Sequence, residues 1–267
     1  MSSVLSDIKK DYIISLLKTG KREDGRGFDD TRNIKIELGI ASKANGSCFV
    51  QIGDTKVIAG VQCEMGEPFP DTPNQGVFTT NAELIPMASP DFEAGPPRED
   101  AIELARIVDR GIRESGAVDF QKLVIKEGEL VRVLFVDLHI MDYNGNLFDA
   151  CGIAAIAALH STKMPALDEE GNKIEGEFVS LPMKKIPIPC TYVKIADSIL
   201  YDPSIEEEAV MDSRITVTTE DSGKISAMQK GDVGSFKKEE ILDIVRRSKI
   251  KGDEIRSLLN EKFSEMR

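Results

Sequence analysis

Three arginines within one short segment are the residues of this chain best suited to binding a charged ligand. Arg106, Arg110 and Arg113 are separated by four and three positions. On a helix this spacing places the three side chains along one face. Guanidinium groups bind phosphates through charge-assisted and often paired hydrogen bonds, so this face is suited to holding a nucleic-acid backbone.

A second interpretation of the same face stays open from the residues alone. It is a solvated helix surface whose positive charges are neutralised by acids about one turn away. The intrahelical pairs would then be Glu103 with Arg106, Arg106 with Asp109, and Arg110 with Glu114.

The chain offers little for histidine-based or zinc-based catalysis. His139 and His160 are its only histidines and neither has a ligand-spaced partner, so we expect no Ser-His-Asp triad and no zinc site. The cysteines lie far apart without a Cys-x-x-Cys pair, and we expect them to be buried, reduced thiols. They are Cys48, Cys63, Cys151 and Cys190.

The overall charge argues against broad binding to nucleic acid. The formal net charge is −12, whereas non-specific binding to a polyanion depends on extended positive surface. RNA contact is therefore expected only through a local basic cluster. No apolar run in the sequence approaches the roughly 18 residues that a membrane span needs, and the N-terminus lacks a signal-peptide pattern. We expect a cytoplasmic protein with no membrane contact.

The three arginines lie in the clearest predicted helix, over 98–115. Two prolines lead into this helix, and Glu99 and Asp100 suit the positive end of the helix dipole. A second helix, over 150–159, consists of small and apolar residues all round, which predicts burial on most of its sides. The apolar stripe of the first helix is expected to be Ile102, Ala105, Val108 and Ile112.

Strands are predicted around these helices. Apolar residues recur at every second position within 33–64, 77–84 and 130–141, which is typical of half-buried strands. Later strands are predicted at 186–188, 191–195, 214–218 and 224–228, followed by closing helices.

Strands followed by helices thus occur once in each half of the chain. The charged, glycine-containing segment 168–177 is expected to be a loop at the boundary between the halves. We predict an α+β fold with two subdomains, each a mixed β-sheet backed by helices. The expected parts are an N-terminal helix and turn over 1–27, a first subdomain over 28–167 and a second over 168–267.

Four motifs, taken in their order and spacing, resemble the RNase PH superfamily over nearly the whole chain. The run Lys-Arg-Glu-Asp-Gly-Arg at 21–26 is similar to the N-terminal signature of that family, and Gly-Asp-Thr-Lys-Val at 53–57 to its first hairpin. The arginine-rich helix around 105–113 resembles the principal RNA-facing helix. The turn and alanine-rich segment at 142–158 resemble the turn into a buried helix.

The resemblance implies a subunit of a ring of RNase PH-like domains around a pore. Such proteins are phosphorolytic exoribonucleases, and the pattern is most similar to the archaeal exosome ring, in which active and inactive paralogues alternate. The segment 202–208 resembles the inactive paralogue. The implied partners are an active RNase PH-like exosome paralogue in a trimer of heterodimers, which is a hexameric ring, RNA-binding cap subunits and single-stranded RNA.

The turn into the alanine-rich helix tests whether the chemistry is retained. In active relatives the phosphate nucleophile sits at this helix N-terminus, held by a serine or threonine hydroxyl and an adjacent arginine. Here residues 144–150 contain no arginine, serine or threonine. We expect Asp149 to be the N-cap, where its carboxylate would repel an incoming anion.

The metal site of active relatives, formed by two aspartates six positions apart, is the second test. Asp202 matches the first position, whereas Glu208 stands at the second, and its longer side chain shifts the oxygens. We therefore predict a non-catalytic protein with no metal and no cofactor. The alternative is an active phosphorolytic 3′–5′ exoribonuclease that uses Asp202 and Glu208 directly.

The resemblance also decides between the two interpretations of the arginine face. It implies that Arg106 and Arg110, together with Arg113 and Arg98, contact RNA, through the backbone and without sequence preference. Arg98 begins the helix and is interpreted either as reaching toward the pore or as an ordinary surface residue. Arg22 and Arg26 are expected to be structural.

Overall fold

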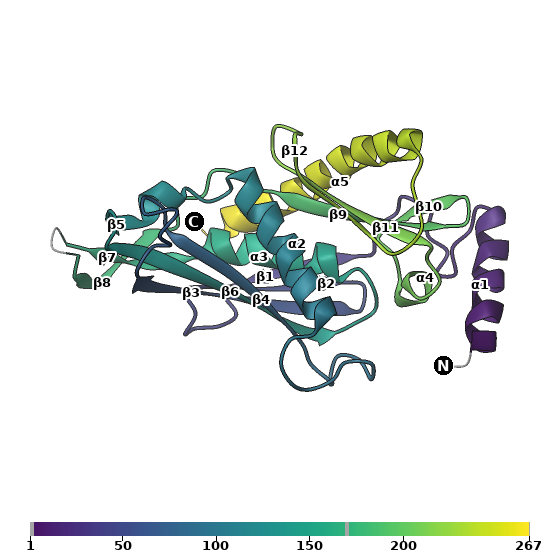
Figure 1. Ribbon diagram of the computed structural model, residues 1–267, viewed down its shortest axis with the longest axis horizontal. Coiled ribbons are helices and arrows are strands. Elements are labelled where there is room, and N and C mark those ends of the chain that lie inside the picture. The colour runs from purple at the N-terminus through teal and green to yellow at the C-terminus, as the bar shows by residue number, and fades with distance from the viewer. Residues whose placement is uncertain (1–2, 169–170, 267) are drawn as a thin grey trace.

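A six-stranded sheet forms the first layer of the computed structural model, which describes residues 3–168 and 171–266 (Figure 1). Its strand order is β1-β2-β3-β6-β4, with β5 paired to β6, and every pairing except that of β4 with β6 is antiparallel. The strands are β1 (Ile34–Leu38), β2 (Gly46–Ile52), β3 (Thr55–Gly66), β4 (Val77–Leu84), β5 (Val124–Lys126) and β6 (Leu130–Asp142). The strands predicted within 33–64, 77–84 and 130–141 are therefore confirmed.

A second sheet of four antiparallel strands has the order β10-β9-β11-β12. Its strands are β9 (Ile188–Ile195), β10 (Ser198–Tyr201), β11 (Ser213–Thr219) and β12 (Ile225–Gly231). Between the sheets in sequence lies a separate hairpin of β7 (Lys163–Leu167) and β8 (Lys173–Ser180). The predicted loop over 168–177 is wrong from residue 173 onward, because β8 begins there, and its positions 169 and 170 lie outside the described residues.

The helices complete four layers, so the α+β prediction with helix-backed sheets is confirmed. Helices α2 and α3 lie between the two sheets, and α5 covers the outer face of the second sheet (Figure 1). The helices are α1 (Ser3–Lys18), α2 (Glu99–Ser115), α3 (Leu147–Ser161), α4 (Ile205–Glu208) and α5 (Lys238–Glu265), with a 3₁₀ helix η1 (Phe120–Leu123). Within the described residues, no helix has both the length and the apolar character needed to cross a membrane.

Helix α3 is buried on nearly all sides, as its composition predicts. The residues from Ala150 to Leu159 are all fully buried, because the helix packs between β2 and β3 on one side and β9 on the other. Small side chains permit this close approach. A Cβ at Gly152 would lie 2.4 Å from Cγ of Pro189 in β9, so only glycine fits there.

Helix α2 buries a face that is rotated from the predicted stripe. Ala105, Val108 and Ile112 are buried as expected, and so are Leu104 and Ile107 on the adjoining positions. Ile102 is 48% exposed, so its assignment to the buried stripe is wrong. The reason is tertiary: this side of α2 faces an open groove rather than a sheet.

The N-terminal helix joins the second half of the chain rather than the first. Ile13 and Leu17 of α1 are buried in a small cluster beside the second sheet. The other buried members of this cluster are Val193, Ile195, Leu200 and Val210. The segment after α1 then carries the buried Arg22 back to this sheet, where its Nη1 donates to the carbonyl of Tyr201 at 2.8 Å.

Candidate nucleic-acid interface

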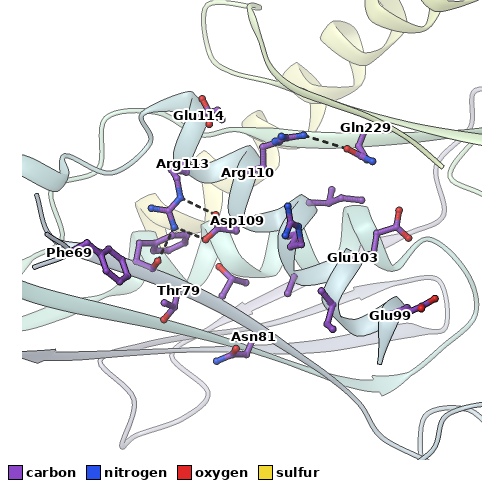
Figure 2. Close-up of a pocket in the computed structure, with 16 residues that line it drawn as sticks. Phe69, Thr79, Asn81, Glu99, Glu103, Asp109, Arg110, Arg113, Glu114 and Gln229 are labelled. Carbon is purple, nitrogen blue, oxygen red and sulfur yellow. Dashed lines mark hydrogen bonds and ion pairs between the residues drawn. The ribbon is translucent and has the colours of Figure 1, made fainter. Parts of the chain in front are cut away.

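An open groove of about 880 Å³ runs along the exposed side of α2. Its walls come from β4, the loop before β4 and β12, so segments distant in sequence meet there (Figure 2). Arg106, Arg110 and Arg113 all line this groove. The predicted placement of the three arginines on one helix face is therefore confirmed.

Arg106 and Arg110 are exposed in the groove, and neither is in an ion pair among the described residues. Both side chains are exposed, and Arg110 makes one long hydrogen bond of 3.5 Å to Oε1 of Gln229. Arg106 has no hydrogen-bond or ion-pair partner among the residues that the structure describes. These two guanidinium groups can therefore bind a phosphate without first breaking an ion pair.

The predicted intrahelical neutralisation of Arg106 is absent from the described residues because its acids are engaged elsewhere. Glu103 accepts a hydrogen bond of 2.7 Å from Arg214 of β11. Asp109 is paired with Arg113, at 2.9 Å. The groove also contains Glu99 and Glu114, which Figure 2 shows toward its two ends, and neither is paired with Arg106 in the described part of the chain.

Arg113 is held in the wall of the groove. Besides the two bonds to Asp109, its Nη2 donates to the carbonyl of Phe78 at 2.8 Å, and the guanidinium lies 5.4 Å from the centre of the Phe78 ring. These contacts fix the side chain and neutralise much of its charge. Arg113 is therefore positioned to shape the groove more than to supply free positive charge.

Arg98 lies apart from the other three arginines. It precedes α2, where its highly exposed side chain pairs with Glu93, and it lines a different hollow formed by the loop of residues 85–98. The structure thus brings together Arg106, Arg110 and Arg113 but not Arg98.

The turn into α3, where active relatives were expected to bind phosphate, is occupied by a carboxylate of the same chain. Asn146 is the N-cap, in the left-handed conformation with φ of 55°. Its backbone N–H donates to Oε1 of Glu208 at 2.8 Å, and the hydroxyl of Tyr143 donates to Oε2 at 2.6 Å. Burial raises the pKa of Tyr143, so this hydroxyl stays protonated and donates. Glu208 therefore takes the anion position at this helix end.

Asp202 is held by an equally complete set of partners. Its Oδ1 accepts from Arg32 at 2.7 Å and from Nδ2 of Asn146 at 2.8 Å, and its Oδ2 accepts from Arg26 at 2.9 Å. The side chain is wholly buried. Burial alone raises the pKa of Asp202, but the hydrogen bonds and charge of Arg32 outweigh it and hold the pKa below its ordinary value.

Asp202 and Glu208, which only the alternative of an active enzyme would use as metal ligands, are therefore both engaged by other groups of the chain. The carboxylate oxygens of Asp202 and Glu208 are both satisfied by donors of the chain itself. Within the described part of the chain, no group of three or more His, Cys, Asp or Glu side chains is arranged to hold a metal ion. The donor set does not fit the metal that active relatives use.

Asp149 is not the N-cap, so that prediction is wrong. It is the third residue of α3 and points into the core, because the left-handed Asn146 starts the helix earlier than expected. Its Oδ1 accepts from the Thr191 hydroxyl at 2.7 Å, and its Oδ2 accepts from the Thr191 backbone at 3.1 Å and from Asn146 at 3.0 Å. Asp149 thus joins α3 to β9 instead of facing an anion.

The burial of Asp149 predicts a pH-dependent contribution to stability. Desolvation raises the pKa of Asp149 from 3.8 to about 7, so the native protein holds a proton that the unfolded chain releases. The contribution of Asp149 to stability is therefore greatest below pH 3.8 and is lost as the pH rises toward 7. Relative to Asp149→Asn, which keeps the shape and one oxygen acceptor for Thr191 but does not ionise, the native chain should lose about 1.4 kcal/mol for each pH unit in this window. Urea unfolding of both proteins between about pH 5 and pH 8 measures this, and parallel profiles would contradict it.

Beside Glu208 lies a second cleft, of about 390 Å³, whose charge is unfavourable to RNA. Among the described residues, the only cation in its wall is Arg214, which is stacked 4.0 Å from the centre of the Phe148 ring and paired with Glu103. The carboxylates of this cleft are those of Asp91, Asp100, Glu103, Glu208 and Asp232. A polyanion would be repelled more strongly from this cleft than from the groove beside Arg106, whose lining has four carboxylates and three arginines.

The cations that pair with Asp202 and Glu207 were not identified from the sequence. Arg32 lies 170 positions from Asp202 and carries no motif of its own. Arg22 and Arg26 are structural, as expected, and Arg22 pairs with Glu207 of α4, at 2.5 Å. Only the run of acids within 202–208 indicated that several cations had to meet them.

Comparison with known proteins places this architecture in a family. The chain belongs to the 3′ exoribonuclease family of RNase PH: residues 30–165 match domain 1 of that family and residues 185–250 match domain 2. Among individual proteins, it is similar to the exosome complex component Rrp42 of Thermococcus kodakarensis, with 55% identity over 257 residues that cover 95% of this chain and 94% of that protein.

Solved structures give the same family. The chain is similar to a chain of the Archaeoglobus fulgidus exosome with RNA bound to the active site, with 46% identity, a TM-score of 0.90 and coverage of 96% of this chain and 99% of that one. It is also similar to a chain of an archaeal exosome core, with 43% identity, a TM-score of 0.86 and coverage of 96% and 98%.

Proposed function

We propose that this chain is a non-catalytic subunit of an archaeal exosome core that degrades RNA in the 3′-to-5′ direction. It pairs with an active RNase PH-like paralogue, and three such pairs close into a hexameric ring beneath RNA-binding cap subunits. Its similarity to exosome component Rrp42 and to chains of solved archaeal exosomes supports this assignment. The proposed location is the cytoplasm. The proposed division of the chain is an N-terminal helix and turn over 1–27, a first subdomain over 28–167 and a second subdomain over 168–267.

The carboxylate of Glu208 at the N-terminus of α3 carries the proposal that this subunit is inactive. Phosphorolysis needs inorganic phosphate at this helix end, and here the backbone N–H of Asn146 already donates to Glu208 at 2.8 Å. Phosphate would have to displace the Glu208 carboxylate, which the Tyr143 hydroxyl also holds. The paralogue therefore carries out phosphorolysis, while this chain shapes the shared site and binds the incoming RNA strand.

Arg106 and Arg110 are the proposed phosphate contacts, because both are exposed and free to bind. Arg113 supports them by forming the groove wall with Phe78. Arg98, on its separate hollow, is proposed to meet RNA outside the groove. Contacts of this kind read the backbone and not the bases, which suits an enzyme that degrades any RNA.

An activity assay on the separate and combined chains tests the division of labour. The purified chain is incubated with single-stranded RNA, inorganic phosphate and Mg²⁺, alone and after mixing with its RNase PH-like paralogue. We expect no nucleoside diphosphates from the chain alone and rapid release from the mixture. A Glu208→Ala variant of the lone chain controls for simple occlusion of the phosphate position. Release of nucleoside diphosphates by the lone native chain would contradict the proposal.

A further inference from the structure

An exposed phenylalanine stands at one end of the groove that contains Arg106 and Arg110. Phe69, in the loop between β3 and β4, is 50% exposed and lines this groove. Figure 2 shows it beyond Arg113, on the far side of the groove from Glu99. The groove therefore offers a large aromatic surface to solvent at one end, in the same groove as the free guanidinium groups of Arg106 and Arg110.

The backbone around Phe69 is restricted, so the Cβ that carries the ring has a defined position. Pro68 precedes it and Pro70 follows it, and a residue before proline is confined to extended conformations. The carbonyl of Phe69 accepts a hydrogen bond of 3.0 Å from the N–H of Thr72, and the end of the loop is fixed by Gly76, whose N–H donates to the carbonyl of Phe120 at 2.8 Å. A loop backbone held in this way loses little entropy when a ligand packs on the ring.

Burial within this chain does not account for Phe69. Phe78 and Phe120, which also lie at this end of the first sheet, pair with each other at a ring-centroid distance of 5.8 Å, whereas Phe69 is in no ring pair among the described residues. Phe78 is fully buried beneath Arg113, so it already fills the wall of the groove and Phe69 is not required there for packing. The exposed face of Phe69 is left for a ligand.

We infer that Phe69 is a stacking platform for a base of single-stranded RNA whose phosphates are held by Arg106 and Arg110. This inference rests on the proposed function of the groove. A cationic track beside an exposed aromatic is the arrangement that binds single strands without sequence preference, because every base has a π face. Phe69 would thus fix the position of one base while the arginines hold the backbone.

RNA binding by the ring assembled from this chain and its paralogue tests the inference, in buffer without phosphate or Mg²⁺ so that the RNA stays intact. The probes are an oligoadenylate and an abasic ribose-phosphate strand of the same length. Phe69→Ala should weaken binding of the oligoadenylate roughly tenfold and leave the abasic strand unaffected, since removing the surface under one stacked base costs about 1–3 kcal/mol. Phe69→Tyr, which keeps the ring, should restore the affinity.

The matched control is Phe178→Ala, which removes a 62% exposed phenylalanine from β8, away from the groove. It should change neither affinity. If Phe69→Ala weakens both strands equally, or lowers the native mass of the assembly, the side chain packs on a partner subunit and the inference is wrong.

The proposed function fails separately from the inference in this experiment. Arg106→Glu should weaken binding of both strands, because it removes a phosphate contact. If Arg106→Glu does so and Phe69→Ala weakens neither strand, the groove binds RNA and the stacking role is wrong. If neither variant changes binding of either strand, both the inference and the RNA-binding role of the groove are wrong.

Discussion

Replacing Asp202 by alanine is expected to lower the free energy of unfolding by about 3–5 kcal/mol, because it leaves the cations of a buried ion-pair network without their anion. Arg32 donates to this carboxylate through three nitrogens, its backbone N, Nε and Nη2, at 2.7–3.0 Å. Arg26 and Asn146 supply the remaining donors. Urea or thermal unfolding of the native chain and the variant measures the loss.

The same variant separates a structural role from a catalytic one. Asp142→Ala, which removes the partner of Lys56 in an exposed pair, is the control and should cost about 0–1 kcal/mol. Because the folded pKa of Asp202 lies below 3.8, its contribution is present above that pH and is lost as the pH falls through the folded value. The difference between native and variant should therefore shrink in acid. A stable variant whose assembled complex no longer degrades RNA would contradict the structural role.

The strands and the two central helices were predictable because their local pattern and their tertiary surroundings agree. Val50 in β2 and Val57 in β3 each belong to a run in which apolar residues recur at every second position, and both become fully buried against α3. The small residues of α3 suit a helix packed between two sheets. The predicted burial of Ile102 was wrong because its local pattern and its tertiary surroundings disagree. An apolar residue at a helix-periodic position is expected to be buried, but among the described residues no element covers that side of α2.

The candidate site was predictable only where its residues lie on one element. Arg106 and Arg110 share a helix face, so their spacing placed them correctly. Glu208 and Asn146 are 62 positions apart, and no local rule brings a carboxylate of α4 to the first turn of α3. Asp149 was misplaced because a left-handed Asn146 moved the helix start, a conformation that the sequence signals weakly.

Reversing the charge of both Arg106 and Arg110 should weaken RNA binding by the assembled ring about a hundredfold, since each charge-assisted hydrogen bond contributes about 1.5 kcal/mol. The dependence of affinity on salt should also become shallower, by about one unit of slope for each phosphate that the ring no longer neutralises. Binding titrations of Arg106→Glu/Arg110→Glu at several salt concentrations measure both effects. The reduction in affinity should be the same for RNAs of different sequence, because the arginines bind the backbone.

The kinetic consequence distinguishes binding from chemistry. If the paralogue supplies the phosphate and metal sites, the double variant should raise the RNA concentration needed for half-maximal phosphorolysis while leaving the maximal rate nearly unchanged. Arg246→Glu/Lys249→Glu is the matched control, because it makes the same charge change at two exposed positions of α5, on the outer layer away from the groove. Equal reductions in the two double variants would mean that net charge, and not the groove, sets the affinity. An unchanged affinity in Arg106→Glu/Arg110→Glu with the ring intact would show that RNA does not bind this face of α2.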